Sequence, residues 1–226
     1  MRIKTTSTLA AVVVSTIALL AQSPGVHPLS GRQFAGVMGY QGAAWLDREE
    51  RDVEEAPDRA LDAIGIAKGS TVADVGAGSG YMTMRMARRV GPEGRVYATD
   101  IQPQMLAMLR ERLQKERITN VTPVQGAVDD PRLPPDTLDL ILLVDVYHEF
   151  SQPQQMLRGM RAALKPGGRL VLLEYKKEDP SIPIRPEHKM TVAEAKLEVE
   201  AEGFRLARVG NELPRQHILV FEKPKP

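Results

Sequence analysis

The stretch from Thr71 to Tyr81 constrains the fold of this chain more than any other segment. Its first half, Thr71–Val75, is a short apolar run with β-branched residues, which predicts a strand buried on both faces. Glycines follow at alternate positions, at Gly76, Gly78 and Gly80, before a segment with helix-forming composition. A glycine-rich turn between a strand and a helix lets the backbone pass close to a ligand and directs free N–H groups toward it. The stretch therefore predicts a strand–turn–helix unit that binds a ligand.

The acidic residue Asp100 indicates the kind of ligand. A glycine pattern alone is weak evidence for any cofactor, because many strand-to-helix turns contain glycine. Here Asp100 ends the next apolar segment, Arg95–Asp100. An acidic residue about 20 residues beyond such glycines can bind a pair of ribose hydroxyls. The two features together indicate a cofactor that contains a nucleoside.

The spacing of the glycines separates two cofactor classes. The dinucleotide fingerprint requires Gly or Ala at the position of Tyr81, for close packing of helix and strand. The pattern Asp-x-Gly-x-Gly-x-Gly, which begins at Asp74, instead resembles the first motif of the class I S-adenosylmethionine-dependent methyltransferases. The resemblance implies that Asp74 lies near the amino group of the methionine part. It also implies a cofactor-binding turn made of Gly76, Ala77, Gly78 and Gly80. An NAD(P)-dependent oxidoreductase and a non-catalytic, exported nucleoside-binding protein remain as alternatives.

Strand and helix patterns alternate along the rest of the chain. We expect strands at 71–75, 95–100, 121–124, 138–144, 170–173, 204–209 and 217–221. The order predicts an α/β fold with a doubly wound, Rossmann-like, seven-stranded sheet, mostly parallel with one antiparallel terminal strand. The turn Leu164-Lys-Pro-Gly-Gly168 resembles the turn that precedes the fifth strand in the methyltransferase family.

In such a sheet, ligands bind beyond the carboxyl ends of the strands. Asp100 and Ile101 follow the second strand, and Ile101 is placed to pack on an adenine face. Many members of the family have an aspartate after the third strand that reaches the adenine amino group. This chain has Ala127 there, so the role falls to Asp129 or to a backbone group. Asp145, at the end of the fourth strand, is expected to line the methionine site.

The catalytic candidates follow the fourth and fifth strands. His148 is either a structural histidine bonded to the backbone or a base or substrate contact at the mouth of the cleft. Glu149 would orient its ring or bind substrate, and Tyr175 follows the fifth strand. Methyl transfer by in-line displacement depends mainly on positioning, and a base adds a smaller factor.

A long loop after the fifth strand brings further polar residues toward these candidates. Its members Glu174, Asp179, His188 and Lys189 are candidates to converge with His148 and Glu149. Carboxylates and histidines suit a hard or borderline metal ion. Because no tight ligand spacing such as His-x-x-x-His is present, we predict a site without metal.

The composition excludes several kinds of chemistry. The 226 residues include no cysteine, which rules out disulfides, thiolate nucleophiles and zinc–thiolate sites. The same absence argues against the methyltransferases that use cysteines to hold arsenite. The formal net charge is +1, and aromatic and basic residues are not interleaved, so we expect no nucleic-acid partner. The methyl acceptor is expected to be a small molecule.

The chain divides into three parts. Residues 1–24 combine a short basic flank with a short apolar core, which predicts a signal peptide and an exported, periplasmic or extracellular protein. An uncleaved N-terminal anchor is the alternative, and it would be the only contact with a membrane. Residues 25–56 form an N-terminal extension that is either a flap across the cleft or a solvated helix pinned by Trp45. Residues 57–226 are expected to form the S-adenosylmethionine-binding domain.

Overall fold

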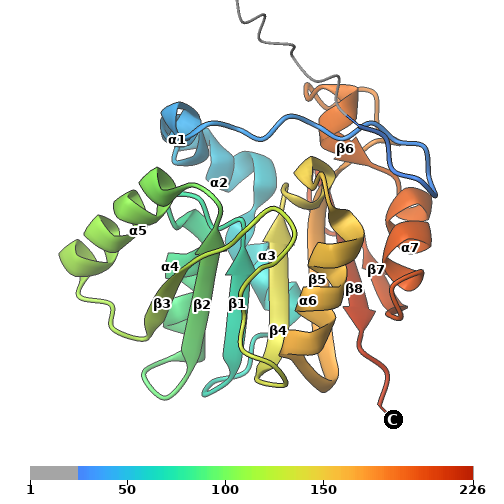
Figure 1. The fold of residues 1–226 in the computed structure, drawn as a ribbon. Helices are drawn as coiled ribbons and strands as arrows, with labels where there is room; N and C mark the ends of the chain where they lie inside the picture. Colours follow the sequence, from blue (N-terminus) through green and yellow to red (C-terminus); the bar gives the residue numbers. More distant parts are fainter. Residues whose placement is uncertain (1–24, 226) are drawn as a thin grey trace, which may run out of the picture.

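The computed structural model describes residues 25–225 and has an α/β fold built on one sheet (Figure 1). The strands lie in the order β3-β2-β1-β4-β5-β8-β7, and β6 pairs with β5 off this path. Among the strands of the described residues, only β8 runs against its neighbours, so the expected single antiparallel strand is confirmed. The bounds are β1 Thr71–Val75, β2 Arg95–Asp100, β3 Val121–Gln125, β4 Leu138–Val144, β5 Leu164–Lys176, β6 Lys189–Met190, β7 Arg205–Gly210 and β8 Gln216–Glu222.

The expected number of strands was seven, and residues 25–225 contain eight. The extra strand, β6, is two residues long and pairs in parallel with Tyr175 and Lys176 of β5. It lies in the long loop that the sequence predicted after the fifth strand. Two residues are too few to produce an alternating apolar pattern, so this pairing left no trace in the sequence.

Helices cover both faces of the sheet (Figure 1). Helices α3 and α4 cover one face together with α5, and α6 and α7 cover the other. Strand β4 shows why both faces are apolar, because Ile141 packs into the cluster with α6 and Leu142 into the cluster with α3 and α4. The bounds are η1 Tyr40–Gly42, α1 Ala43–Leu46, α2 Glu50–Glu55, α3 Pro57–Ile64, α4 Tyr81–Val90, α5 Pro103–Glu116, η2 Tyr147–Glu149, α6 Pro153–Ala163, η3 Pro186–His188 and α7 Val192–Glu200.

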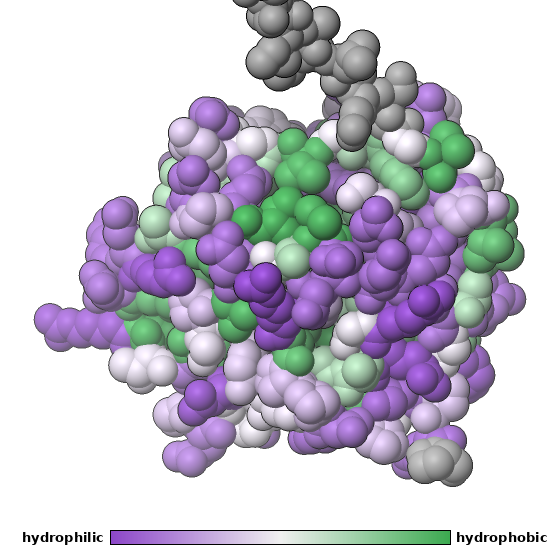
Figure 2. Space-filling model, in the orientation of Figure 1, coloured by the Kyte–Doolittle hydropathy of each residue, from purple (hydrophilic) through white to green (hydrophobic). Residues whose placement is uncertain are grey.

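The N-terminal segment, residues 25–40, crosses the upper edge of the sheet from α7 to α1 (Figure 1). Arg32 fixes it there, because its buried guanidinium donates to Glu198 of α7 at 2.9 Å and to the carbonyl oxygen of His148 at 3.1 Å. Apolar side chains gather along this edge in Figure 2, and Val26, Leu29 and Val37 are among the exposed apolar residues of the segment. The segment therefore covers the loops that follow the strands.

The predicted signal peptide or anchor, residues 1–24, lies outside the described residues. Between residues 25 and 225, no helix is long and apolar enough to cross a membrane.

Candidate active site

A cavity of about 370 Å³ opens at the carboxyl ends of the strands, beneath the N-terminal segment. Its volume is in the range of pockets that bind a single small ligand or cofactor. The glycine turn and the loops after β2 to β5 line it, and Val37, Met38, Trp45 and Leu46 of the extension close it from above. The cavity thus lies where the topology of the sheet predicted a ligand.

The glycine turn brings backbone rather than side chains to the cavity wall. Gly76 has φ of 75°, and a Cβ atom there would lie 2.3 Å from a methyl carbon of Val146. Gly80 has φ of 94°, and a Cβ atom would lie 2.5 Å from Leu109. Any side chain at either position would therefore be strained and would collide with its neighbour. Ala77 and Gly78, between them, line the cavity as predicted.

Asp100 joins the glycine turn to the end of β2. Its Oδ2 accepts the N–H of Gly78 at 2.9 Å, and its Oδ1 accepts the N–H of Gln102 at 2.8 Å. Each carboxylate oxygen retains a second lone pair, so both can still accept a ribose hydroxyl. Burial raises the pKa of Asp100 above its ordinary value. Ile101 lies beside it at the cavity with 36% of its surface exposed, available to pack on a base.

Two further carboxylates face the cavity near the turn. Asp74 is buried, accepts the hydroxyl of Thr83 at 2.5 Å, and burial raises its pKa to about 6. Asp145 has a left-handed backbone, with φ of 53°, and its Oδ2 accepts the side-chain amide of Gln216 at 2.7 Å. Its Oδ1 is buried without a hydrogen-bond partner among residues 25–225. Burial, with the nearby carboxylates of Glu55 and Glu174, raises the pKa of Asp145 well above its ordinary value.

These carboxylates fit the amino group of S-adenosylmethionine. The free Oδ1 of Asp145 lacks a donor, and an ammonium group would supply both the hydrogen bond and the opposite charge. A Cβ atom would not fit at Gly76, so the adjoining backbone can approach a ligand closely. The residues around the cavity therefore match the cofactor that the sequence motif predicted.

Asp129 does not reach the cavity. The structure places it on the surface, whereas Gly126, Ala127 and Val128 line the cavity. The N–H of Ala127 donates to the carbonyl oxygen of Asp130 at 2.8 Å, and this turn directs Asp129 outward. Of the two candidates proposed from the sequence, only the backbone group at this loop is in position to contact an adenine.

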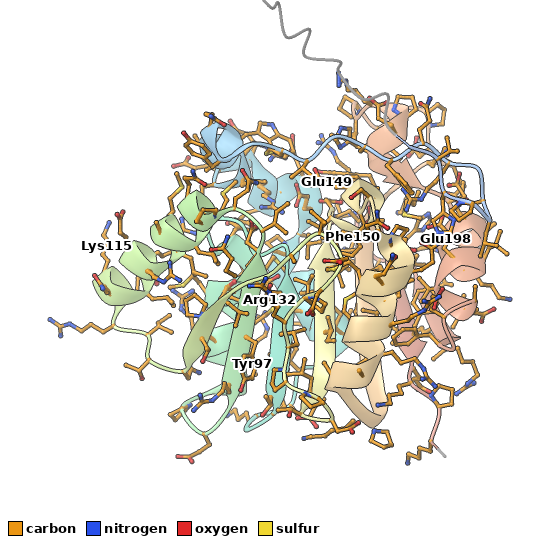
Figure 3. All side chains as sticks on the ribbon, viewed as in Figure 1. Tyr97, Lys115, Arg132, Glu149, Phe150 and Glu198 are labelled. Atoms are coloured by element: carbon orange, nitrogen blue, oxygen red, sulfur yellow. The ribbon has the colours of Figure 1, made fainter. Side chains whose placement is uncertain are left out.

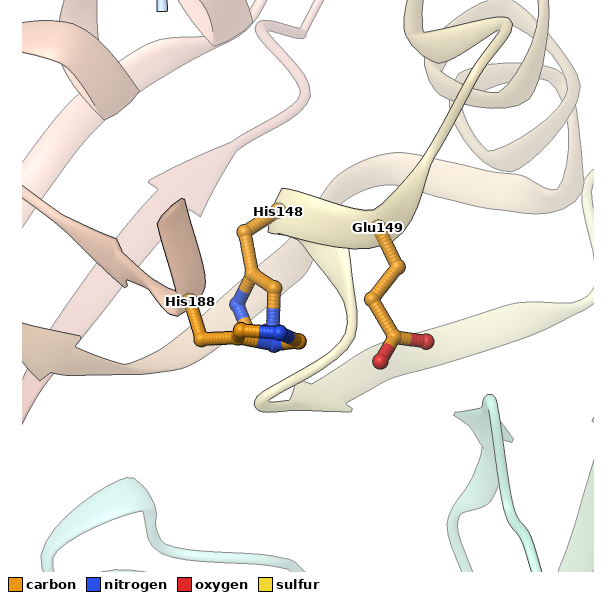
Figure 4. Close-up of side chains that lie close together, drawn as sticks. All are labelled: His148, Glu149 and His188. Carbon is orange, nitrogen blue, oxygen red and sulfur yellow. The ribbon is translucent and has the colours of Figure 1, made fainter. Parts of the chain in front are cut away.

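His148 lies at the other side of the same cavity. Its ring is buried, and Nδ1 lies 2.6 Å from the buried Oε2 of Glu174. Its Nε2 lies 3.2 Å from Nδ1 of His188. Figure 4 shows the two rings next to each other. Two side chains therefore hold the ring. The structural interpretation of His148 had assumed that the backbone would hold it.

Glu149 lies beside His148 (Figure 4) and just beyond the end of β4 (Figure 3). Its Oε1 accepts the N–H of Met38 from the N-terminal segment at 3.2 Å. Burial raises the pKa of Glu149 to about 7. This carboxyl group is therefore able to exchange a proton near neutral pH.

Tyr175 also lines the cavity, but its hydroxyl is directed elsewhere. It donates to Oε1 of Glu55 at 2.8 Å, and burial raises the pKa of Tyr175 well above its ordinary value. A phenol in this state donates hydrogen bonds and does not act as a base near neutral pH. Tyr175 therefore holds Glu55, and the structure gives no support to its prediction as a catalytic group.

The long loop after β5 brings only some of its polar residues to the site. Glu174 and His188 meet His148, as the sequence suggested. Lys189 instead donates to the carbonyl oxygens of Ile182 and Asp179, at 2.6 and 3.2 Å, and fixes the path of the loop.

Comparisons with known proteins agree with this geometry. A model of the family described as "Methyltransferase domain" matches residues 72–168. The ubiquinone/menaquinone biosynthesis C-methyltransferase UbiE of Enterobacter sp. (strain 638) is 37% identical over 118 residues, which cover 52% of this chain and 47% of that protein. The crystal structure of a SAM-dependent methyltransferase from Aquifex aeolicus is 29% identical, with a TM-score of 0.77, over 82% of this chain and 98% of that one. The family match, the relatives and the solved structure together support a class I S-adenosylmethionine-dependent methyltransferase. The same findings support S-adenosylmethionine as its cofactor.

The family match covers the cofactor side of the cavity more completely than the acceptor side. The family match includes Asp74, Asp100, Asp145 and His148 of this methyltransferase, but it ends before Tyr175 and His188. The chain spans about half the length of the curated relatives it matches. The acceptor side of this methyltransferase is therefore described best by its own geometry.

Sequence patterns did not indicate a role for Arg51 and Glu55. Both are buried, Arg51 donates to Glu55 at 2.6 Å and to the carbonyl oxygen of Leu46 at 2.9 Å, and Arg51 lines the cavity. Arg51 and Glu55 are four residues apart on a charged helix, and this spacing is typical both of solvent-exposed ion pairs and of buried ion pairs. Only the tertiary structure of the methyltransferase distinguishes the two.

Proposed function

We propose that this methyltransferase transfers a methyl group to a small, largely apolar acceptor. One observation carries the proposal: the glycine turn and Asp100, on the cofactor side, line the same cavity as His148 and Glu149. A cofactor bound along the turn and an acceptor bound near His148 would thus share one enclosed space. S-adenosylmethionine supplies the activated methyl group on a sulfonium centre.

The walls of the cavity support an apolar acceptor. Trp45, Phe150, Met156 and Ile184 contribute apolar surface, and the polar groups on the acceptor side are concentrated at His148 and its neighbours. Such a pocket binds a hydrophobic body and orients it through a few polar contacts. The curated relatives are named as C-methyltransferases of ubiquinone and menaquinone biosynthesis. A ring carbon activated by a neighbouring hydroxyl is therefore the first acceptor class to test.

The residues of this chain act mainly by positioning. Holding the acceptor in line with the reacting methyl group accounts for most of the acceleration in such a transfer. In the absence of a metal ion, the pair of His148 and Glu174 adds a base, because the carboxylate accepts from Nδ1 and leaves Nε2, which faces His188 at the cavity, without a proton of its own. A positioned base contributes about 10²- to 10⁴-fold.

The extension, residues 25–56, is proposed as a flap that closes over both substrates. Gln102 donates to the carbonyl oxygen of Met38 at 2.9 Å and accepts the N–H of Tyr40 at 2.8 Å. Leu46 packs so close to the turn that a Cβ atom at Gly78 would lie 3.1 Å from it. These contacts support a role in excluding water from the reacting groups. Residues 57–226 would then form the cofactor-binding domain proper.

Two measurements on the full chain test the proposal. Titration calorimetry with S-adenosylmethionine, S-adenosylhomocysteine and NAD should show binding of the first two only. Transfer of a labelled methyl group to a panel of quinols that lack a ring methyl should then give a carbon-methylated product. Binding of NAD with no binding of S-adenosylhomocysteine would refute the proposal, and methylation confined to oxygen would refute the acceptor class.

A further inference from the structure

We propose that His148, Glu149 and His188 bind one divalent transition-metal ion on the acceptor side of the cavity. Their ligand atoms all lie within 4.8 Å of one another. Figure 4 shows the three side chains converging from two segments, η2 and η3. The sequence predicted a site without metal, because His188 lies 40 residues after His148 and the spacing carries no ligand pattern.

The pairing of β6 with β5 is what brings the second histidine into place. Lys189 of β6 lies opposite Tyr175 of β5, so His188, one residue earlier, lies next to the end of the strand that carries Glu174. Nδ1 of His188 then faces Nε2 of His148 at 3.2 Å. Two nitrogens bound to one tetrahedral Zn²⁺, each about 2.0–2.1 Å from the ion, lie about 3.4 Å apart. The spacing of the two rings therefore already approaches that of a pair of ligands.

Glu174 holds His148 in the form that binds metal. It lies 2.6 Å from Nδ1 of His148, and its other oxygen accepts the N–H of Tyr147 at 2.9 Å. This arrangement places the proton on Nδ1 and leaves the lone pair of Nε2 directed toward His188. Metal-binding histidines usually donate their second N–H to a carboxylate in this way, which fixes the ring and raises its basicity. Glu174 is thus a positioning residue for the ion.

Glu149 completes the set of ligands and supplies negative charge. Its Oε1 accepts the N–H of Met38, which leaves Oε2 for an ion. Two imidazoles and one carboxylate are donors for borderline ions such as Zn²⁺ and Fe²⁺, whereas Mg²⁺ and Ca²⁺ prefer oxygen donors alone. We therefore assign the site to a borderline transition metal.

Three protein ligands leave at least one coordination position open to the cavity. An oxygen of the acceptor bound there would be polarised and held as its anion. This role rests on the proposed methyl transfer, and in the metal-bound enzyme it would replace the action of His148 as a base, because Nε2 would then be bound to the ion. Binding of the ion itself does not rest on that function. Because Glu149 also holds Met38, a bound ion would fix the carboxylate that anchors the N-terminal segment.

Zn²⁺ titration tests the site directly. The full chain, freed of metal with a chelator, should bind one Zn²⁺ in competition with a chromogenic indicator. His188→Ala and Glu149→Gln should each lower the affinity at least tenfold, and Glu174→Gln should lower it by about 10- to 100-fold. His217→Ala is the matched control, because His217 also pairs with a carboxylate, that of Glu178 at 2.8 Å, but does not line the cavity. The affinity of the His217→Ala variant for Zn²⁺ should equal that of the unmodified chain.

Binding of S-adenosylhomocysteine, measured on the same samples, shows that each variant is folded. A chain that binds S-adenosylhomocysteine but no Zn²⁺ would overturn the metal site and leave the proposed function intact. Stoichiometric Zn²⁺ binding that survives in both His188→Ala and Glu149→Gln would place the ion elsewhere and also overturn it. Zn²⁺ binding without S-adenosylhomocysteine binding in the unmodified chain would contradict the proposed function and not the metal site.

Discussion

Replacement of Asp100 by alanine is the sharpest perturbation of the cofactor side. In the structure each oxygen of this carboxylate already accepts one backbone N–H, from Gly78 and from Gln102. One lone pair on each oxygen remains for the ribose hydroxyls. Asp100→Ala removes these contacts to a charged group, which are worth about 1.5–3 kcal/mol. The affinity for S-adenosylhomocysteine should therefore fall roughly 10- to 150-fold.

The same substitution should have a smaller effect on stability. Burial raises the pKa of Asp100, so part of the free energy gained from its two backbone contacts is already offset by loss of hydration. We expect the free energy of unfolding to fall by about 1–2 kcal/mol. The Asp100→Asn variant should bind S-adenosylhomocysteine as weakly as the Asp100→Ala variant, because the new NH₂ group would face the N–H of either Gly78 or Gln102.

Titration calorimetry and urea unfolding on the same preparations separate the two effects. Asp129→Ala is the control, because Asp129 is exposed, carries the same charge and lies away from the cavity lining. Its affinity should be unchanged. If Asp100→Ala kept full affinity, or if Asp129→Ala weakened binding as much, the assignment of the ribose site would be wrong.

Four further predictions concern other parts of the chain. Gly76→Ala should lower the free energy of unfolding by about 2–4 kcal/mol, because φ at this position is 75° and the new carbon would lie 2.3 Å from Val146. In urea titrations, adding Val146→Ala should restore part of the lost stability. An ammonium group needs an ionised partner, and burial raises the pKa of Asp74 to about 6, so affinity for S-adenosylhomocysteine should fall below that pH by about tenfold per pH unit. Calorimetry on Asp74→Asn should show a shallower slope, because Asp145, whose pKa is also raised, still titrates. His148→Ala should lower single-turnover methyl transfer by about two to four orders of magnitude with cofactor affinity nearly intact; a destabilised but fully active variant would exclude a catalytic role. Mass spectrometry of the protein from fractionated native cells should find a mature N-terminus between about residues 22 and 26, and full-length protein in the cytosol would contradict export.

The framework of the fold was predictable because buried parallel strands have a simple pattern. Arg95–Asp100 and Leu138–Val144 were predicted to the residue, since each is an apolar run bounded by polar residues. Residues that follow such strands gather at one edge of the sheet. That rule correctly brought Asp100 and His148 to a single cavity.

The rule does not describe the paths of loops. Asp129 follows a strand too, but a turn closed by Ala127 and Asp130 directs it to the surface. His188 lies in a long loop, and its position depends on the pairing of β6 and on the buried amine of Lys189. Such contacts join residues far apart in the sequence, so no local pattern contains them.

The ion pair between Arg32 and Glu198 has a consequence for biosynthesis. A chain is made from its N-terminus, so residues 25–40 leave the ribosome long before α7 exists. Arg32 therefore has no partner until Glu198, 166 residues later in the chain, has been translated. Until then the segment that carries Val37 and Met38, which line the cavity, lacks this anchor. The nascent chain cannot complete this ion pair before α7 has been made.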